Sequence, residues 1–168
     1  MLNYQNKYTK QQIWDFLAEI PDPEIPVITI VDLGVLREVE VLSNKVIITI
    51  TPTYSGCPAM KMFEDEIKKK LHTEGIENVE LQMVYSPAWT TDWMSDEALE
   101  KLNKYGIAPP VKGSHDKGVL FENGPKIVQC PQCGSKNTVL KSQFGSTACK
   151  ALYQCKDCLE PFDYFKCI

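Results

Sequence analysis

Two short motifs, Cys130-Pro131-Gln132-Cys133 and Cys155-Lys156-Asp157-Cys158, decide the fold of the C-terminal part of this chain. Each Cys-x-x-Cys motif presents two sulfur ligands from one tight turn, and the 21 residues between the motifs leave room for two strands and a loop. Two such turns joined by a hairpin form a closed tetrahedral site of four thiolates, which suits structural zinc. We therefore expect residues 127–168 to form a small zinc-ribbon β module around these four cysteines.

Three of the seven cysteines lie outside the two motifs. Cys149 and Cys167 flank the second motif. They are either packing thiols or a sign of another arrangement, namely a different four-sulfur set or an iron–sulfur cluster in place of zinc. Zinc on the two motifs is the favoured interpretation because each Cys-x-x-Cys pair brings its ligands together locally. Thiol–disulfide exchange at one of the pairs is a further alternative.

Length and charge narrow the class of protein. A chain of 168 residues favours one domain of ordinary size plus a small appendage. The net charge is −4 and no basic stripe is visible, which argues against a nucleic-acid-binding ribbon. The polar first twelve residues do not resemble a secretory signal, and no apolar run is long enough to span a membrane. We expect a cytoplasmic protein with no membrane partner, where paired cysteines bind metal rather than form disulfides.

Hydrophobic periodicity predicts the elements of the N-terminal part. A capping box of Thr9 and Gln12 begins the first helix, and the β-branched run from Lys45 to Thr51 reads as a strand. The predicted elements are a helix over 9–20, strands over 35–42 and 45–51, a helix over 58–72, a strand over 79–85, and a helix between Ser95 and Gly106.

The predicted fold class is therefore α+β. A small three-stranded sheet carries helices on one face, in the order helix-strand-strand-helix-strand-helix, and the ribbon follows it. We expect this first domain to occupy residues 8–106. Residues 107–126 are rich in Pro, Gly and charge, so we expect a linker there, with one short strand at 119–121.

Cys57 is the isolated cysteine with the clearest chemical interpretation. Proline is favoured at the first position of a helix, so Pro58 makes Cys57 the predicted N-cap. A thiol there lies beside unpaired backbone N–H groups and the positive end of the helix dipole, which favour the thiolate. The thiolate is the form that acts as a nucleophile and binds soft metals. The alternative is a small buried residue with no chemistry.

The segment Pro21-Asp22-Pro23-Glu24-Ile25-Pro26 is a stiff acidic loop, because its three prolines remove three backbone donors. Asp22 and Glu24 can join a thiolate around iron. Alternatively they are solvated turn residues, with Asp22 capping the residues after it, and the spacing alone favours this second interpretation. Asp32 has the same two interpretations, and the role of a turn former is favoured over that of a ligand.

An aromatic cluster of Trp89, Trp93 and Met94 precedes the last predicted helix. The favoured interpretation is that these side chains close the open end of a small core. A partner-binding surface is the alternative, because three large residues gather in one loop.

Several catalytic signatures are missing from the sequence. Neither His72 nor His115 belongs to a Glu-x-x-His pair, which di-iron carboxylate oxygenases need. No Gly-x-Gly-x-x-Gly, Walker or Gly-x-Ser-x-Gly motif occurs. The sequence therefore predicts a protein that does not itself catalyse hydride transfer, phosphoryl transfer or hydrolysis.

Three N-terminal motifs carry a family resemblance. They are Asp22-Pro23-Glu24-Ile25-Pro26, Val31-Asp32-Leu33-Gly34 and Thr51-Pro52-Thr53-Tyr54-Ser55-Gly56-Cys57-Pro58. Their order and spacing resemble the metal–sulfur cluster assembly family, which includes SufT-like proteins. The resemblance implies a carrier or adaptor in iron–sulfur protein maturation, with Cys57 as the functional thiol and with Asp22 and Glu24 as its helpers.

The rest of the chain narrows the resemblance. The stretch Tyr85–Met94 and the C-terminal pattern C-P-x-C-G-S … Y-x-C-x-x-C-x-E-P-F-D-Y-F-K-C-I are similar to the PaaD or PaaJ family, the D subunits of multicomponent phenylacetyl-CoA 1,2-epoxidases. This implies a non-catalytic accessory subunit that helps to assemble an iron or iron–sulfur centre in partner oxygenase and reductase subunits. The cargo would be transient iron or a cluster. The alternative is a structural or docking subunit that transfers no metal.

Overall fold

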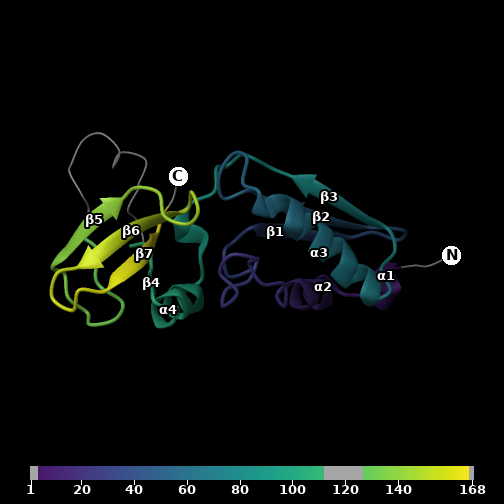
Figure 1. Cartoon of the computed structure of the whole chain (residues 1–168). Coiled ribbons are helices and arrows are strands. Elements are labelled where there is room, and N and C mark those ends of the chain that lie inside the picture. Colours follow the sequence, from purple (N-terminus) through teal and green to yellow (C-terminus); the bar gives the residue numbers. More distant parts are fainter. Residues whose placement is uncertain (1–3, 112–126, 167–168) are drawn as a thin grey trace. The chain divides into compact units, whose positions relative to one another are not determined.

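The protein is described by a computed structural model that covers residues 4–111 and 127–166. The chain divides into two compact units, Met1–Trp89 and Thr90–Ile168, and each is described by itself below (Figure 1). Within the described residues, no helix is both long enough and apolar enough to cross a membrane.

The described residues of the first unit form three helices and three strands. They are α1 Tyr4–Lys7, α2 Lys10–Leu17, β1 Leu36–Val41, β2 Val46–Ile50, α3 Ala59–Thr73 and β3 Val79–Met83. The capping box predicted for α2 is present: the Thr9 hydroxyl accepts from the Gln12 N–H at 3.1 Å, and the Gln12 side chain accepts from the Thr9 N–H at 2.8 Å. The short helix α1 was not predicted, and it buries Tyr4.

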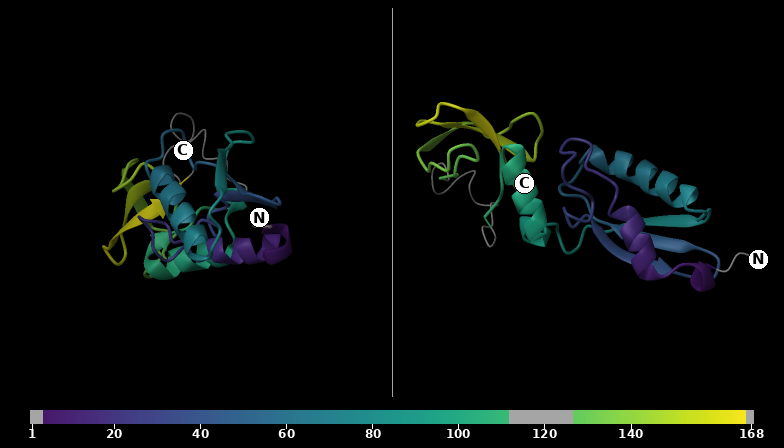
Figure 2. Two further views of the ribbon diagram at one scale, coloured as in Figure 1. Left: turned by 90° about the vertical axis from the view of Figure 1, so that its right-hand side faces the viewer. Right: turned by 90° about the horizontal axis from the view of Figure 1, so that it is seen from below.

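The three-stranded sheet has the order β1-β2-β3. β1 and β2 form the predicted antiparallel hairpin, whereas β2 and β3 are parallel. A parallel pair needs a crossover connection, and α3 supplies it. α3 lies along one face of the sheet (Figure 2), and α2 contacts both α3 and β1, so the two helices pack on the predicted single face.

The core of the first unit lies between this sheet face and the helices. Successive side chains of a strand point to opposite faces, and on β2 the residues Val46, Ile48 and Ile50 are fully buried while those between them are half-buried. The buried face of α3 repeats at helical spacing, as the sequence predicts. It consists of Ala59, Met60, Phe63, Ile67 and Leu71.

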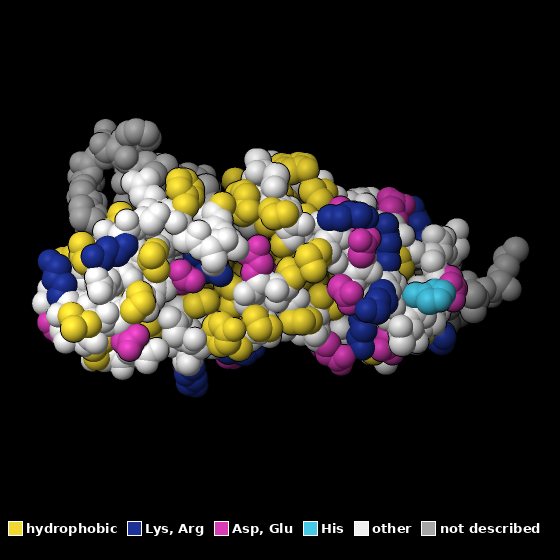
Figure 3. Space-filling view, viewed as in Figure 1, with side chains coloured by type: hydrophobic (Ala, Val, Ile, Leu, Met, Phe, Trp, Pro, Cys, Tyr) yellow, Lys and Arg dark blue, Asp and Glu magenta, His cyan; other side chains and the backbone are white. Residues whose placement is uncertain are grey.

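The opposite face of α3 carries charges of both signs. Figure 3 shows Lys side chains interleaved with Asp and Glu over this helix. Lys61 contacts Asp65 at 2.8 Å, and Lys70 contacts Glu19 at 2.7 Å. Because these lysines are paired with carboxylates, α3 does not present the uniform basic surface that binds nucleic acid.

In the part of the second unit that the structure describes, there are a short 3-10 helix, one α-helix and four strands. They are η1 Thr91–Trp93, α4 Asp96–Tyr105, β4 Ile107–Ala108, β5 Thr138–Ser142, β6 Lys150–Cys155 and β7 Pro161–Phe165. The strand order is β4-β7-β6-β5, with β4 parallel to β7 and the other pairs antiparallel. The hairpin predicted between the two Cys-x-x-Cys motifs is the β5–β6 pair, and β7 extends it on the other side of β6.

The boundary between the units differs from the expected one. The sequence places the last helix in a first domain of residues 8–106 and a linker at 107–126, whereas the structure divides the chain after Trp89. Ser95 caps α4 as predicted, but at its other end Gly106, with φ 94°, turns the chain directly into β4. β4 then pairs with β7, which ties α4 to the ribbon. The strand expected at 119–121 lies outside the described residues.

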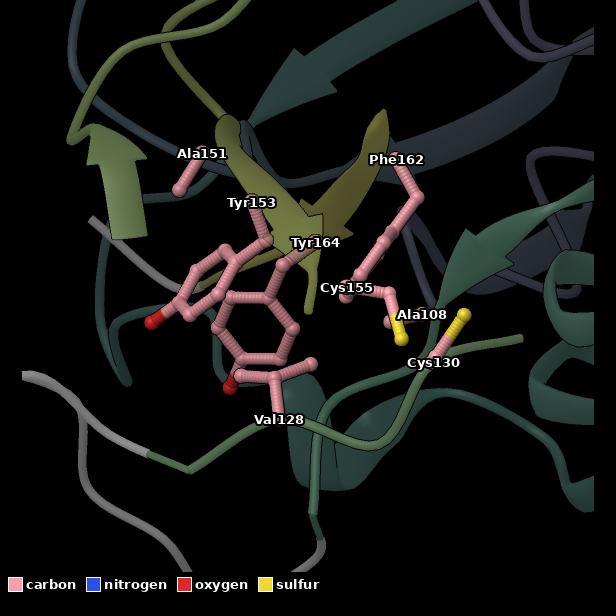
Figure 4. Packing of buried hydrophobic residues seen from close by; sticks show 8 residues of the cluster. All are labelled: Ala108, Val128, Cys130, Ala151, Tyr153, Cys155, Phe162 and Tyr164. Atoms are coloured by element: carbon pink, nitrogen blue, oxygen red, sulfur yellow. The ribbon is translucent and has the colours of Figure 1, made fainter. Parts of the chain in front are cut away.

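The core of the second unit is small and aromatic (Figure 4). The Tyr153 ring stacks on Phe162 with centroids 5.9 Å apart, and it meets Tyr164 edge-on at 5.8 Å. Cys130 and Cys155 belong to the same cluster of buried residues. The aromatic core and the cysteine site therefore share side chains.

Candidate metal centre and candidate thiol site

The two Cys-x-x-Cys turns share one backbone feature, a positive φ just after the last cysteine. In the first turn the Gly134 N–H donates to the Cys130 carbonyl at 2.9 Å. The residue after the last cysteine takes a positive φ in both turns, 75° at Gly134 and 67° at Leu159. Glycine adopts this conformation without steric cost, whereas a leucine does so only where the surrounding structure holds it. The sulfur atoms of the two turns lie close to one another.

The four sulfur atoms form a compact group. Cys130 Sγ lies 3.8 Å from Cys158 Sγ, and Cys133 Sγ lies 3.6 Å from Cys155 Sγ. All four lie within 4.8 Å of one another. A tetrahedral zinc ion with Zn–S bonds of about 2.3 Å needs sulfur atoms about 3.8 Å apart. The donor set and its spacing therefore fit a closed structural zinc site.

The site is buried on one side. Cys130 and Cys155 are almost completely buried, Cys158 is half-buried and Cys133 is exposed. Figure 4 shows the sulfur atoms of Cys130 and Cys155 at the edge of the aromatic cluster. A metal held here would lie against the core on one side and near solvent on the other.

The thiols of Cys155 and Cys158 differ in pKa. The backbone N–H of Cys158 lowers the pKa of Cys155 to about 7, against the opposing effect of burial. The backbone N–H of Glu160 lowers the pKa of Cys158, but burial and hydrogen bonds with the three other thiols outweigh it and raise this pKa to about 12. A metal ion binds thiolates, so its binding must release the protons that these sulfur atoms share.

Two hydrogen bonds hold the Asp22 side chain in its loop. Its Oδ1 accepts from the backbone N–H of Glu24 at 2.8 Å and of Ile25 at 2.7 Å, and Asp22 is only 9% exposed. This is the capping geometry that the sequence offered as one interpretation. The Glu24 side chain is exposed. Asp32 is also a turn former, since its Oδ2 accepts from the Thr29 N–H at 3.0 Å.

Cys57 lies in a tight turn before α3 and is half-buried. Its N–H donates to the Tyr54 carbonyl at 3.2 Å, and its own carbonyl accepts from Met60 at 3.2 Å. Gly56 precedes it with φ 79°, a value that favours glycine. The N-cap of α3 is Pro58, so the helix begins one residue later than expected and Cys57 immediately precedes the cap.

Only one preformed multi-ligand group exists within residues 4–111 and 127–166. It consists of the four ribbon cysteines, and no other set of at least three Cys, His, Asp or Glu side chains there is gathered closely enough to hold a metal ion. Cys57, Asp22 and Glu24 therefore do not form a preformed three-ligand site in this structure.

The structure also shows the surroundings of Trp89 and Cys149, two residues that the sequence analysis singled out. Trp89 is buried, and its indole N–H donates to the Leu33 carbonyl at 2.8 Å, which is the core-closing role. Cys149 is half-buried with its Sγ 3.1 Å from the Thr147 hydroxyl, and it stands outside the four-sulfur group. Cys167 lies outside the described residues.

Sequence reasoning missed three polar residues beside the ribbon cysteines. Asp157 lies inside the second Cys-x-x-Cys turn, and its carboxylate accepts from Ser135 at 2.5 Å and from Asn137 at 2.7 Å. The available signal was weak: a Ser and an Asn follow the first turn closely, and an acid lies inside the second. Nothing in that spacing predicts that they meet.

Two family models match separate parts of the chain. Residues 10–83 match an "Iron-sulfur cluster assembly protein" family, and residues 115–166 match a "PaaD zinc beta ribbon domain". The first match falls within the first unit, and the second contains all four ribbon cysteines.

Individual proteins match either nearly the whole chain or a part of it. The chain is 50% identical to the Escherichia coli (strain K12) protein named as the D subunit of a "Putative 1,2-phenylacetyl-CoA epoxidase", over 94% of this chain and 92% of that protein. It is 32% identical to a Porphyromonas gingivalis "Fe-S protein maturation auxiliary factor", over 60% of this chain and 97% of that protein. Among solved structures, a "Domain of Unknown Function DUF59" from Bacillus anthracis matches with a TM-score of 0.52 and 30% identity, covering 55% of this chain and 90% of that one.

Proposed function

Because the chain belongs to the family of phenylacetyl-CoA epoxidase D subunits, we propose that it is a non-catalytic accessory subunit of such an epoxidase. It assists the assembly of an iron or iron–sulfur centre in the oxygenase or reductase subunits during aerobic phenylacetate degradation. The observation that carries this proposal is the pairing of an iron–sulfur assembly domain and a PaaD ribbon in one chain, at 50% identity to the Escherichia coli relative.

In this proposal, Cys57 of the first unit carries the cargo. Its side chain is half-buried rather than sealed in the core, and it immediately precedes the N-terminus of a 15-residue helix. The positive end of the helix dipole there favours a bound anionic group. A single thiolate without a preformed ligand set suits a group that is bound briefly and then passed on.

The two carboxylates have different tasks in this proposal. Asp22 fixes the loop, since its side chain accepts two backbone hydrogen bonds there. Glu24 extends from the same loop with an exposed carboxylate, an oxygen donor of the kind that binds iron. Cys57 and Glu24 are thus the candidate ligands, and Asp22 holds the segment that presents one of them.

The ribbon of the second unit holds zinc through Cys130, Cys133, Cys155 and Cys158, and it docks on the oxygenase or reductase. A zinc ion in a closed four-thiolate site supplies folding energy and leaves no open coordination position for a substrate. The small aromatic core beside it is too limited to hold such a module alone. The zinc therefore maintains the shape of the docking module and takes no part in the transfer.

The decisive experiment co-expresses the epoxidase subunits with Cys57→Ser. We expect the oxygenase and reductase to contain less iron and to epoxidise more slowly, because serine does not replace a thiolate as a soft ligand. Cys149→Ser is the matched control, since Cys149 is also half-buried but lies outside both candidate sites. Normal iron content with the Cys57 variant would remove this residue from the mechanism.

A second candidate function is docking without metal transfer. The observation in its favour is that the described residues contain no preformed multi-ligand group other than the ribbon. Truncation after Trp89, the end of the first unit, separates the two candidates. If the truncated chain fails to support epoxidation while Cys57→Ser supports it fully, docking is the function.

A further inference from the structure

The two Cys-x-x-Cys turns are joined by more than their sulfur atoms. Asp157 lies between Cys155 and Cys158, and its two carboxylate oxygens face residues that come after the first turn. The Ser135 hydroxyl donates to Asp157 Oδ2 at 2.5 Å, and the Asn137 amide donates to Asp157 Oδ1 at 2.7 Å. One side chain of the second turn thus binds two side chains that adjoin the first.

Backbone hydrogen bonds fix both ends of this connection. The Ser135 carbonyl accepts from the Cys130 N–H at 2.8 Å, so Ser135 is attached to the first turn. The Asn137 carbonyl accepts from the Lys156 N–H at 2.8 Å, so Asn137 is attached to the second. The Ser135 hydroxyl also accepts from the Asn137 N–H at 3.0 Å. The three side chains and these backbone groups form one continuous network across the two turns.

The charge of Asp157 does not explain its position. A carboxylate close to four thiolates adds negative charge where negative charge is already concentrated, and it favours protonation of the sulfur atoms. On electrostatic grounds alone, a neutral residue would serve the metal site better. Hydrogen bonds to an ionised acceptor are, however, stronger than neutral ones, and a carboxylate can accept from two donors at once. The Asp157 carboxylate is therefore useful because its hydrogen bonds hold the two turns in position.

We propose that Asp157, Ser135 and Asn137 form a clasp that holds the two Cys-x-x-Cys turns at the spacing the metal requires. The residues are positioning residues: they touch no metal, but they fix the turns that carry the ligands. Removing such a partner of a metal site typically costs about 10- to 100-fold in metal affinity. The clasp rests on the proposal that the ribbon binds zinc.

The test measures zinc release from the full chain to a chromogenic chelator, under anaerobic and reducing conditions. Asp157→Asn removes the negative charge and turns one acceptor oxygen into an amide donor, which the Ser135 hydroxyl can meet only by reversing its own hydrogen bond. Both charge-assisted hydrogen bonds of the clasp are thereby replaced by weaker neutral ones. If the clasp positions the turns, zinc leaves this variant about 10- to 100-fold faster than the wild type. If charge alone mattered, the variant would hold zinc as tightly as the wild type or more tightly, and the proposal would be overturned.

Two further variants control for charge and for folding. Glu160→Gln removes an exposed carboxylate two residues after Cys158, and zinc release should stay within about twofold of the wild type. Ser135→Ala removes two hydrogen bonds of the network, the one that its hydroxyl donates to Asp157 and the one that it accepts from the Asn137 N–H, and it keeps the charge. Release should therefore become faster, and an unchanged rate would contradict the clasp even if Asp157→Asn did not fold. Cobalt substitution reports whether each variant keeps a tetrahedral thiolate site. A wild-type chain that binds no zinc would overturn the zinc assignment instead.

Discussion

The first unit, Met1–Trp89, and the second unit, Thr90–Ile168, differ in what fills their interiors. Large aliphatic side chains fill the first, among them Ile13, Leu17, Ile48, Ile67 and Leu71, all fully buried. The interior of the ribbon consists largely of aromatic rings together with cysteines that also form the metal centre. Burial of apolar surface can therefore stabilise the first unit, whereas the second, if the ribbon binds zinc as proposed, depends on its metal.

Metal removal should separate the two units most strongly. The binding free energy of structural zinc is about 10–16 kcal/mol in small zinc modules and is largely folding free energy. We expect an excess of chelator to unfold the ribbon while the first unit keeps its structure. NMR spectra of the full chain would show this as a loss of dispersion for residues of the second sheet, β4 to β7, and not for residues of the first unit. A ribbon that stays folded without metal would contradict the expectation that only the second unit needs metal to fold.

A cavity in the first core should have the next largest effect. Ile48 is fully buried on β2, where it is paired with Val39 of β1 and Leu81 of β3. Ile48→Ala should lower the free energy of unfolding of the first unit by about 2–5 kcal/mol, and urea titration followed by circular dichroism measures it. Ile47→Ala is the matched control on the other sheet face, where the side chain is half-buried, and it should cost less. Faster zinc release from Ile48→Ala would show that the units are coupled.

Trp89 tests where the first unit ends. It is the last residue of that unit, and its indole N–H satisfies the carbonyl of Leu33, a buried residue. Trp89→Phe keeps an aromatic ring but leaves the carbonyl without this donor, at a cost of about 1–3 kcal/mol. The loss should appear in the urea unfolding of the first unit and not in the rate of zinc release. An unchanged unfolding midpoint would mean that the bond contributes nothing.

A surface ion pair of the first unit should give the smallest effect, and a pH-dependent one. Hydrogen bonds from Lys45, 2.6 Å away, and from Gln82 lower the pKa of Glu80 below its ordinary value. A carboxyl group whose pKa falls on folding stabilises the protein above its unfolded pKa, and this contribution disappears as the pH falls through the folded value. Glu80→Gln should therefore lower the unfolding midpoint slightly at pH 7, and the difference from wild type should vanish in acid. A difference that is independent of pH would point to packing instead.

Local signals predicted most of the first unit. The Thr9–Gln12 capping box, the β-branched run of β2 and the apolar face of α3 each depend on neighbours within one element, so one sequence suffices to find them. The parallel pairing of β2 with β3 and the pairing of β4 with β7 depend on contacts between distant segments. Two residues, Ile107 and Ala108, form β4, which is too short for any periodicity to show.

The same distinction applies to the sites. The Cys-x-x-Cys spacing identified the residues that the structure gathers into one group, because each pair is local. The contacts of Asp157 with Ser135 and Asn137 join residues at least 20 positions apart, and polar residues in loops carry no repeating pattern. The spacing of Asp22 and Glu24 offered two interpretations, and only coordinates show that Asp22 accepts hydrogen bonds from the N–H groups of Glu24 and Ile25.

The place of β7 in its sheet has a consequence for biosynthesis. β7 is the last strand along the described chain, yet it lies between β4 and β6. A nascent chain that has left the ribosome up to Trp89 already contains every strand of the first sheet, whereas β4 must wait for residues 161–165 before it finds a partner. Domains generally fold as units while synthesis continues. The N-terminal unit can thus mature during translation, whereas the four-cysteine group is not complete until the ribbon is almost fully synthesised.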